Sequence, residues 1–233
     1  MRIEGSHILI TGGSLGIGKA TAKLLIEAGA KVAITGRNAS RVEAAAKELG
    51  ALAIVADVSS EADVKRTYSE FFAAFPRLDA LVNNAGIGEH RELAGVTVDS
   101  FRAVWETNVL GAALMAREAA EAFKTQQYGN IVNIASTSGL RGYESGTMYV
   151  ASKFALRGMT ECWRAELRKH NVRVTLVNPS EVTTAFGSRD GIERPEKANK
   201  LRSVEIAHAI KGALEMDDRG FITDLTVFAT NPF

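Results

Sequence analysis

Short apolar runs alternate with longer amphipathic segments along the whole chain, and this alternation restricts the fold more than any other feature. Runs rich in β-branched residues predict strands, and apolar residues three or four positions apart predict helices. The strands are expected near residues 7–11, 31–35, 51–55, 79–83, 129–135, 172–177 and 221–228. The helices are expected near residues 17–28, 40–49, 60–75, 98–123, 149–169 and 203–215. Because a crossover helix follows nearly every strand, we predict an α/β fold with a parallel sheet covered on both faces.

The length and continuity of the pattern indicate a single domain. The chain has 233 residues, of which 46% are hydrophobic, which is enough to bury a sizeable core. No linker, repeat or low-complexity stretch interrupts the alternation, so residues 1–233 are expected to form one catalytic domain. The segment 179–202 is irregular, charged and contains Gly187, Gly191 and Pro195. Loops of this length are usually functional or disordered, and we interpret this one as a lid over the substrate.

The charge balance restricts the class of partner. The chain carries 28 Lys and Arg against 27 Asp and Glu, a net charge of +1, and these residues are scattered rather than collected in runs. Neither a nucleic-acid groove nor a polybasic membrane patch is therefore expected. We predict that the partner is a small molecule or a second copy of the chain.

Cysteine, histidine and N-terminal composition favour a cytoplasmic protein without a metal. The single cysteine, Cys162, cannot form an internal disulfide and is expected to be a buried, small apolar residue. The four histidines show no metal-ligand spacing. Residues 1–6 leave no room for a signal peptide, and no stretch approaches the ~18 apolar residues of a membrane helix. A reducing compartment fits these features.

Polar residues follow one predicted strand after another. Ligands of an open parallel sheet bind beyond the carboxyl ends of its strands. The residues at these ends are, in strand order, the glycine turn that begins at Gly12, Arg37, Asp57, the segment 84–86, Ser136 and Pro179. All of them are expected at one edge of the sheet, which is the predicted functional edge.

The glycine turn Gly12-x-x-x-Gly16-x-Gly18 connects the first strand to the first helix. Glycines permit a tight bend and a close approach of the backbone to a ligand, and the amino end of a helix favours a diphosphate. We interpret the turn as a dinucleotide-binding segment. Its predicted cofactor-binding residues are Gly12, Ser14, Leu15, Gly16, Ile17 and Gly18.

Three other interpretations use the same residues. The turn could be an ordinary corner between a strand and a helix. Residues 13–19 nearly match a P-loop, but Ala20 stands where a hydroxyl is needed for Mg²⁺. Residues 12–16 also match a nucleophile elbow, which would make Ser14 the nucleophile of a serine hydrolase. That elbow would lie on the first strand, and no histidine is clearly placed as its base.

The residues at the end of the second strand indicate whether NAD or NADP is preferred. An acid about 20 residues beyond the turn would bind the ribose 2′-hydroxyl of NAD, whereas an arginine accommodates the 2′-phosphate of NADP. The strand ends with Thr35, Gly36, Arg37 and Asn38, without an acid. Arg37 offers a planar set of donors, which Thr35 or Asn38 could assist. We predict that NADP(H) is preferred and that NAD(H) is possible; the alternative is that Arg37 is a solvated surface residue.

Tyr149, Lys153 and Ser136 form the predicted catalytic group. Tyr149 and Lys153 stand four residues apart on a helix and therefore share a face, while Ser136 ends the fifth strand. A phenol can pass a proton to a carbonyl oxygen, and a serine hydroxyl can polarise that carbonyl. A nearby lysine and an oxidised nicotinamide can lower the tyrosine pKa from ~10. By itself such a Tyr–Lys pair is more often a surface pair, but three features here agree on hydride-transfer chemistry.

Taken together, these motifs show that the chain resembles the short-chain dehydrogenase/reductase family over nearly its whole length. The motifs are, in the order of the family, Thr11-Gly12-x-x-x-Gly16-x-Gly18, Asp57-Val58, Asn83-Asn84-Ala85-Gly86, Asn108, Ser136, Tyr149-x-x-x-Lys153 and Asn178-Pro179. The resemblance implies a Rossmann-type, doubly wound sheet of seven strands. It also implies a catalytic tetrad of Asn108, Ser136, Tyr149 and Lys153, in which the asparagine holds a water that passes protons to the lysine.

The resemblance assigns further residues to the cofactor. Asp57 and Val58 would contact the adenine, and Asn84, Ala85 and Gly86 would support the cofactor. Pro179, Val182 and Thr184 would line it near the lid, and Tyr149 and Lys153 would also contact it.

The resemblance also suggests the activity and the assembly. The expected reaction moves a hydride between NADP(H) and a carbonyl compound or a secondary alcohol, and 3-oxoacyl thioesters are one plausible substrate class. A homodimer or homotetramer would form through the long helices after the fourth and fifth strands. The non-enzymatic alternative is a dinucleotide-binding sensor or scaffold without turnover.

Overall fold

The structure is a computed structural model that describes residues 1–187, 192 and 194–231. Seven strands form one parallel sheet in the order β3-β2-β1-β4-β5-β6-β9. They are β1 His7–Ile10, β2 Lys31–Gly36, β3 Leu52–Val55, β4 Ala80–Asn83, β5 Gly129–Ile134, β6 Val172–Pro179 and β9 Asp224–Val227. The predicted fold class is confirmed, including the number and direction of the strands.

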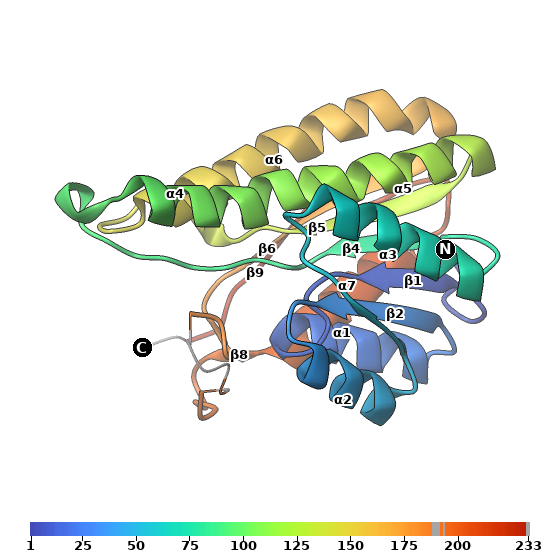
Figure 1. Ribbon diagram of the computed structural model, residues 1–233, viewed down its shortest axis with the longest axis horizontal. Coiled ribbons are helices and arrows are strands. Elements are labelled where there is room, and N and C mark those ends of the chain that lie inside the picture. Colours follow the sequence, from blue (N-terminus) through green and yellow to red (C-terminus); the bar gives the residue numbers. More distant parts are fainter. Residues whose placement is uncertain (188–191, 193, 232–233) are drawn as a thin grey trace.

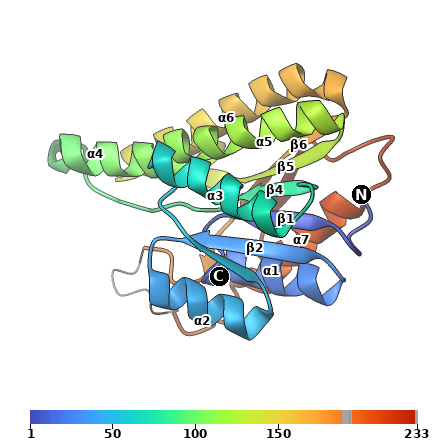
Figure 2. The ribbon, with the colours of Figure 1, turned by 45° about the vertical axis from the view of Figure 1, so that its right-hand side comes forward.

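Helices cover both faces of this sheet (Figure 1). Helices α1, α2 and α7 lie on one face, and α3, α5 and α6 lie on the other, as the turned view in Figure 2 also shows. Their bounds are α1 Gly16–Glu27, α2 Ala39–Leu49, α3 Glu61–Ala74, α5 Ala112–Gln126, α6 Thr147–Leu167 and α7 Ser203–Glu215. The caps follow the sequence: Ser60 accepts a hydrogen bond from the Asp63 N–H, and Gly50 ends α2 in the left-handed region.

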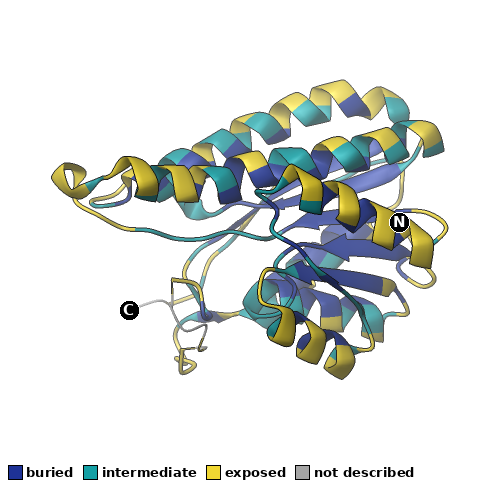
Figure 3. Ribbon diagram, in the orientation of Figure 1, coloured by how far each residue is buried: buried dark blue, intermediate teal, exposed yellow. Residues whose placement is uncertain are grey.

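Alternate residues of each central strand enter two separate cores. In β1, Ile8 and Ile10 pack in the core under α1 and α7, whereas Leu9 packs in the core under α3 and α5. All four residues of β1 are buried (Figure 3), because a parallel sheet with helices on both faces has no side exposed to water. This double burial explains why the central strands are continuous apolar runs instead of alternating ones.

The chain first adds strands on one side of β1 and then, from β4 onward, on the other side. Strands β1 to β3 extend the sheet one way, and β4, β5, β6 and β9 extend it the other way. The sheet therefore has its topological switch point between β1 and β4, and ligands of such sheets bind in a crevice beyond the carboxyl ends of the strands at this point. The glycine turn and the segment 84–86 are the two loops that border this crevice.

The helix predicted at residues 98–123 is divided by a π-helical turn. It consists of α4 Val98–Trp105, the π-helix η2 Glu106–Gly111, and α5. A side chain at Gly111 would approach Cγ2 of Val58 to 2.7 Å, so the glycine allows the helix to lie against the loop after β3. Such π-turns occur frequently at functional sites, and this one contains Asn108.

The environment of Cys162 differs from the prediction. Cys162 lies on α6 and is exposed rather than buried. The buried face of α6 is supplied by other residues, including Leu156, Thr160 and Leu167. Burial on a helix depends on which face meets the sheet, and the small apolar character of cysteine does not decide that.

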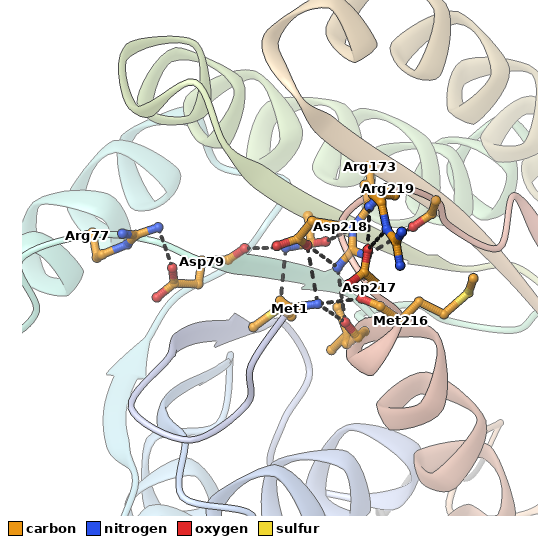
Figure 4. A network of polar contacts seen from close by, with 11 residues as sticks. Met1, Arg77, Asp79, Arg173, Met216, Asp217, Asp218 and Arg219 are labelled. Atoms are coloured by element: carbon orange, nitrogen blue, oxygen red, sulfur yellow. Dashed lines mark hydrogen bonds and ion pairs between the residues drawn. The ribbon is translucent and has the colours of Figure 1, made fainter.

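The opposite edge of the sheet is held by a network of structural contacts (Figure 4). Arg173 on β6 donates to Oδ1 of Asn130 at 2.7 Å and to the Leu214 carbonyl, at the end of α7, at 3.0 Å. It also lies 3.5 Å from a carboxylate oxygen of Asp218. These contacts satisfy carbonyl groups that the helix itself leaves unpaired, so this edge ties α7 to the sheet. In the part of the chain that the structure describes, no helix is long and apolar enough to span a membrane.

Candidate active site

The glycine turn and the segment after β4 form one unit. Gly12 (φ +63°) and Gly16 (φ +53°) both have left-handed backbone, which L side chains rarely adopt. A side chain at Gly12 would lie 3.0 Å from the Cα of Ala85. Asn84 joins the two loops, because its Nδ2 donates to the carbonyls of Thr11 and Gly12 at 2.9 and 3.0 Å. The segment 84–86, which was predicted to support the cofactor, is therefore hydrogen-bonded to the glycine turn itself.

The start of α1 faces the same crevice. Its N-cap residue, Leu15, has an apolar side chain that cannot accept a hydrogen bond, and no acid occupies residues 16–19. The positive end of the helix dipole is therefore not neutralised by the helix's own first turn, which suits a phosphate. Ser14 lies beside the end of β2, since a side chain at Gly36 would lie 3.4 Å from its Oγ.

Gly18 is the most closely packed glycine of the turn. A Cβ there would lie 2.4 Å from the Gly12 carbonyl oxygen and 2.5 Å from Nδ2 of Asn84. We expect Gly18→Ala to push the turn apart, lowering the stability by about 1–3 kcal/mol and the affinity for NADPH by at least about tenfold. Urea denaturation and NADPH titration measure both effects.

Gly212 provides the matched control because it also lies inside a helix, α7. Apart from its chain neighbours and the backbone of its own helix, no described atom comes within 4 Å of a Cβ placed there. Gly212→Ala should therefore raise the stability by about 0.5–1 kcal/mol and leave NADPH affinity unchanged. Equal changes in stability and in NADPH affinity for the two variants would contradict the close packing inferred for Gly18.

Arg37 and Asp57 stand together after β2 and β3. Nη1 of Arg37 lies 3.8 Å from Oδ2 of Asp57, and the Arg37 side chain is exposed. Asp57 Oδ1 accepts hydrogen bonds from the N–H and hydroxyl of Ser59 at 2.9 and 2.7 Å, which fixes the carboxylate. The neighbouring Val58 is buried against Gly111. A cation and an oriented carboxylate therefore lie next to each other at the predicted nucleotide end of the site.

The two residues suggested to assist Arg37 are placed differently from each other. Thr35 is fully buried within β2, so its hydroxyl cannot reach a ligand at the surface. Asn38 is the N-cap of α2 and its Oδ1 accepts from the Arg41 N–H at 3.0 Å. The alternation of side chains along β2 explains the burial of Thr35, because residues 33 and 35 point into one core.

Asn108 is locked by its neighbours rather than exposed on a helix surface. Its Oδ1 accepts from the Ile87 N–H at 2.8 Å, and its Nδ2 donates to the Ile87 carbonyl at 2.9 Å. The same Nδ2 donates to Oγ of Ser152 at 3.0 Å. A Cβ at Gly86 would lie 3.3 Å from Asn108 Oδ1 and 3.7 Å from Nζ of Lys153. The π-turn thus places Asn108 beside the lysine and beside the segment 84–86.

Ser136, Tyr149 and Lys153 converge at the carboxyl edge. Ser136 follows β5, and its Oγ accepts from the Ser138 N–H at 3.1 Å. A side-chain hydrogen bond joins it to the hydroxyl of Tyr149. Nζ of Lys153 lies 5.5 Å from the centroid of the Tyr149 ring and donates to the Ile134 carbonyl at 2.9 Å. The structure therefore brings together the phenol, the ammonium group and the alcohol that the sequence separates.

Burial moves the pKa of both titratable groups. It raises the pKa of Tyr149 to about 12, although the hydrogen bond to Ser136 acts in the opposite direction. It lowers the pKa of Lys153 from 10.5 to about 8. The sequence suggested that the lysine and an oxidised nicotinamide would lower the tyrosine pKa. For the protein chain alone the direction is upward, because removal of the phenolate from water outweighs the other effects.

The start of the predicted lid packs on the glycine turn. Pro179 ends β6, Val182 lies in β7 Val182–Thr183, and β7 pairs with β8 Leu201–Arg202. A side chain at Gly16 would approach Thr184 to 3.3 Å. Pro179, Val182 and Thr184, which were predicted to line the cofactor, therefore lead from β6 toward the glycine turn. The remainder of the predicted lid includes residues 188–191 and 193, which lie outside the described residues.

Four residues near Tyr149 were not identified from the sequence. Ser152 donates to the Tyr149 carbonyl at 2.7 Å and links it to Asn108. The rings of His90, Tyr143 and Phe186 lie in loops around Tyr149. The position of Ser152 next to Lys153 was a usable signal. No sequence signal indicated His90, Tyr143 or Phe186, because loops carry no periodic pattern.

The residues at this edge fit a nicotinamide dinucleotide. The glycines let the turn pack closely against Asn84, Ala85 and Thr184, the first turn of α1 suits the diphosphate, and Arg37 is an exposed cation for a ribose phosphate. Lys153 and Tyr149 lie at the other end of the crevice. Across residues 1–187, 192 and 194–231, no group of three or more His, Cys, Asp or Glu side chains could hold a metal ion.

Comparison with known families gives a direct match. The family model of short chain dehydrogenases matches residues 6–194. A 3-oxoacyl-[acyl-carrier-protein] reductase of Bos taurus is 37% identical over 177 residues, which cover 75% of this chain and 75% of the bovine protein.

Solved structures share the whole fold. A 3-ketoacyl-(acyl-carrier-protein) reductase from Brucella melitensis, complexed with NADH, superimposes with a TM-score of 0.87 at 30% identity and covers 99% of this chain and 100% of its own. An alcohol dehydrogenase from the archaeon Thermococcus sibiricus, complexed with 5-hydroxy-NADP, gives a TM-score of 0.90 at 27% identity, with 97% of both chains covered. These relatives bind NADH in one case and an NADP derivative in the other.

Proposed function

Since the chain belongs to the short-chain dehydrogenase/reductase family of oxidoreductases, we propose that it transfers a hydride between NADP(H) and a carbonyl compound or secondary alcohol. The observation that carries this proposal is the convergence of Ser136, Tyr149 and Lys153 at the edge that also holds the glycine turn. The proposal treats residues 1–233 as one catalytic domain, with a lid near residues 179–202.

Each catalytic side chain has a separate role in the reaction. When bound, the nicotinamide dinucleotide supplies the hydride in reduction and accepts it in oxidation. Tyr149 carries its proton at neutral pH and gives it from Oη to the carbonyl oxygen during reduction, or accepts it in the reverse direction. Ser136 donates a hydrogen bond to the same oxygen and stabilises the developing alkoxide. Lys153 stabilises the phenolate that remains and holds the nicotinamide ribose.

Asn108 has a supporting role in this proposal. Its side chain is fully engaged with Ile87 and Ser152, so it cannot itself carry protons through its amide. The π-turn places Asn108 close to Lys153, and we expect a water held beside this turn to pass protons to the lysine. Phosphate and adenine would be held by the glycine turn, Asp57 and Val58.

The preference for NADP(H) rests on Arg37. A charge-assisted hydrogen bond to phosphate is worth about 1.5–3 kcal/mol. We therefore expect Arg37→Gln to raise the KM for NADPH by about 10- to 100-fold and to change the KM for NADH by less than about twofold. Steady-state kinetics with both cofactors measure this.

Lys47→Gln is the matched control for Arg37. Lys47 is an exposed cation in the last turn of the neighbouring helix α2. Its replacement should leave both KM values unchanged. If Arg37→Gln weakens NADH and NADPH equally, the arginine does not recognise the 2′-phosphate.

A panel of carbonyl compounds tests the proposed activity directly. Small ketones, quinones, sugars and a 3-oxoacyl thioester are each incubated with NADPH and, separately, with NADH, and cofactor absorbance is followed. The identity to a 3-oxoacyl-[acyl-carrier-protein] reductase supports the thioester as one candidate. NADPH binding without turnover of any carbonyl would favour a sensor or scaffold instead. Labelling of Ser14 by a phosphonylating probe would favour the hydrolase.

We also propose a homodimer or homotetramer that forms through α4, α5 and α6. Val104, Met115, Phe123 and Leu156 on these helices are buried in the core. Trp105 and Phe154 are 40% and 45% exposed, and they leave apolar surface for a second copy. Light scattering at micromolar concentration is expected to give at least twice the chain mass, and a monomer would contradict this assembly.

A further inference from the structure

Three rings surround Tyr149 and form, with it, an aromatic cluster of His90, Tyr143, Tyr149 and Phe186. The centroid of Phe186 lies 5.4 Å from that of Tyr149, with the rings inclined at 56°. The centroid of His90 lies 5.9 Å from Tyr149 and 5.9 Å from Tyr143. These distances are those of favourable ring pairs. The cluster comes from four separate segments: the loop after β4, the segment before α6, α6 itself, and the segment after β7.

Two glycines make room for the outer rings. A Cβ at Gly88 would lie 2.5 Å from Cε1 of Phe186, so the ring of Phe186 lies directly on the Gly88 backbone. A Cβ at Gly146 would lie 2.8 Å from Cε2 of Tyr143, which places the second ring on the Gly146 backbone. Any other residue at position 88 or 146 would displace the ring beside it. The backbone therefore accommodates both outer rings of the cluster.

Tyr143 is also held by polar contacts. Its hydroxyl lies 3.0 Å from Nε2 of His90, and the two rings stack with an angle of 28°. The Arg91 N–H donates to the Ser145 carbonyl at 3.0 Å and joins the two loops that carry these rings. Ser145 has a left-handed φ of +61°, which costs free energy in a residue other than glycine.

The outer rings remain open to solvent although the cluster is well ordered by contacts. Phe186 is 38% exposed and Tyr143 is 46% exposed. Their exposed surface flanks the phenol to which the proposed function assigns the proton transfer. Apolar surface concentrated beside a reactive group indicates where the body of a substrate is bound.

We propose that the aromatic cluster recognises the substrate and selects carbonyl compounds in which the carbonyl is attached to a flat, conjugated ring, such as aryl ketones and aryl aldehydes. This inference rests on the proposed function and specifies its substrate class. Flat rings pair with Phe186 and Tyr143 through their quadrupoles, in addition to the area that they bury. A saturated ring of the same size buries similar area but lacks this contribution.

Acetophenone and cyclohexyl methyl ketone are the matched pair that tests this proposal. Both are methyl ketones of nearly the same size, and they differ in the flatness and π-electrons of the ring and in its conjugation with the carbonyl. We expect kcat/KM with NADPH to favour acetophenone by about tenfold. Phe186→Leu and Tyr143→Leu should each reduce this preference by at least about threefold, because leucine keeps an apolar contact but has no ring.

Phe72→Leu is the control, since Phe72 on α3 is 39% exposed, almost as much as Phe186, and lies outside the aromatic cluster. It should leave the preference unchanged. The same ratio is measured for binding, by calorimetric titration of each ketone into the protein loaded with NADP⁺. A binding ratio near one in the wild-type protein, or one unaffected by Phe186→Leu, would overturn the inference even if ketones are reduced. A preserved binding ratio without reduction of any carbonyl would instead contradict the proposed function.

Discussion

Replacing Tyr149 with phenylalanine is expected to lower kcat for carbonyl reduction by about 10³-fold or more, while the Kd for NADPH changes by less than about twofold. Proton transfer by a positioned side chain contributes about 10²–10⁴-fold to a rate, and the Tyr149 hydroxyl is the group hydrogen-bonded to Ser136. Phenylalanine retains the ring that packs against Phe186 and His90. Stopped-flow reduction of an accepted ketone and fluorescence titration of NADPH separate chemistry from binding.

The control removes a tyrosine hydroxyl elsewhere. Tyr128 precedes β5 at the opposite edge of the sheet, where the Arg77 guanidinium lies 5.5 Å from its ring. Tyr128→Phe should retain full turnover. Turnover by Tyr149→Phe within fivefold of the wild type would remove Tyr149 from the proposed mechanism. If the biological activity survives while turnover is lost, the sensor hypothesis would gain support.

Replacing Lys153 with methionine is expected to abolish measurable turnover and to increase the free energy of unfolding by about 2 kcal/mol at pH 7. Lys153 is buried, and burial lowers its pKa from 10.5 to about 8. That difference corresponds to about 3 kcal/mol of cost for keeping the charged form in the folded protein. Loss of the hydrogen bond to the Ile134 carbonyl reduces this gain in stability by about 1 kcal/mol. The site therefore retains an ammonium group at the expense of stability.

The pH dependence of this gain has a definite sign. Between pH 8 and pH 10.5 the folded protein has lost the Lys153 proton, whereas the unfolded chain still binds it. The wild-type protein therefore gains stability as the pH rises through this window, and methionine does not titrate. The stability difference between Lys153→Met and wild type should shrink by about 2 kcal/mol between pH 7 and pH 9.5. Urea denaturation at the two values measures it.

Lys65→Met supplies the comparison for Lys153. Lys65 is exposed on α3 and lies 3.4 Å from Glu61, a surface pair that contributes less than about 1 kcal/mol. Its replacement should change the stability little at either pH. A destabilised Lys153→Met protein with an unchanged pH profile would show that the lysine is not held against a desolvation cost.

Much of the candidate site could be predicted because it depends on strand ends. Period and composition distinguish a strand from a helix locally, and in a parallel sheet all carboxyl ends lie at one edge. Gly12, Arg37, Asp57, Asn84 and Ser136 could therefore be placed at one edge without knowing any distance. The turn residues were accessible for the same reason, since a glycine requirement is a property of the backbone itself.

The surroundings of each side chain could not be predicted in this way. The burial of Thr35 and the exposure of Cys162 depend on which face of an element meets a neighbour. The packing of the π-turn at Asn108 against the loop after β3 depends on Gly111, where a side chain would clash with Val58. The raised pKa of Tyr149 depends on how deeply its hydroxyl is buried.

The sequence by itself determined the order of strands and helices along the chain, because it follows from short-range periodicity. It also determined the edge of the sheet on which the polar residues lie, because that edge follows from the direction of the chain. Only the tertiary structure decided that Lys153 donates to Ile134 and that rings from His90, Tyr143 and Phe186 gather at Tyr149. Desolvation and ring packing act over a few ångströms between segments that are far apart in the chain. No local pattern encodes such distances, so they become defined only when the sheet and both helix layers have assembled.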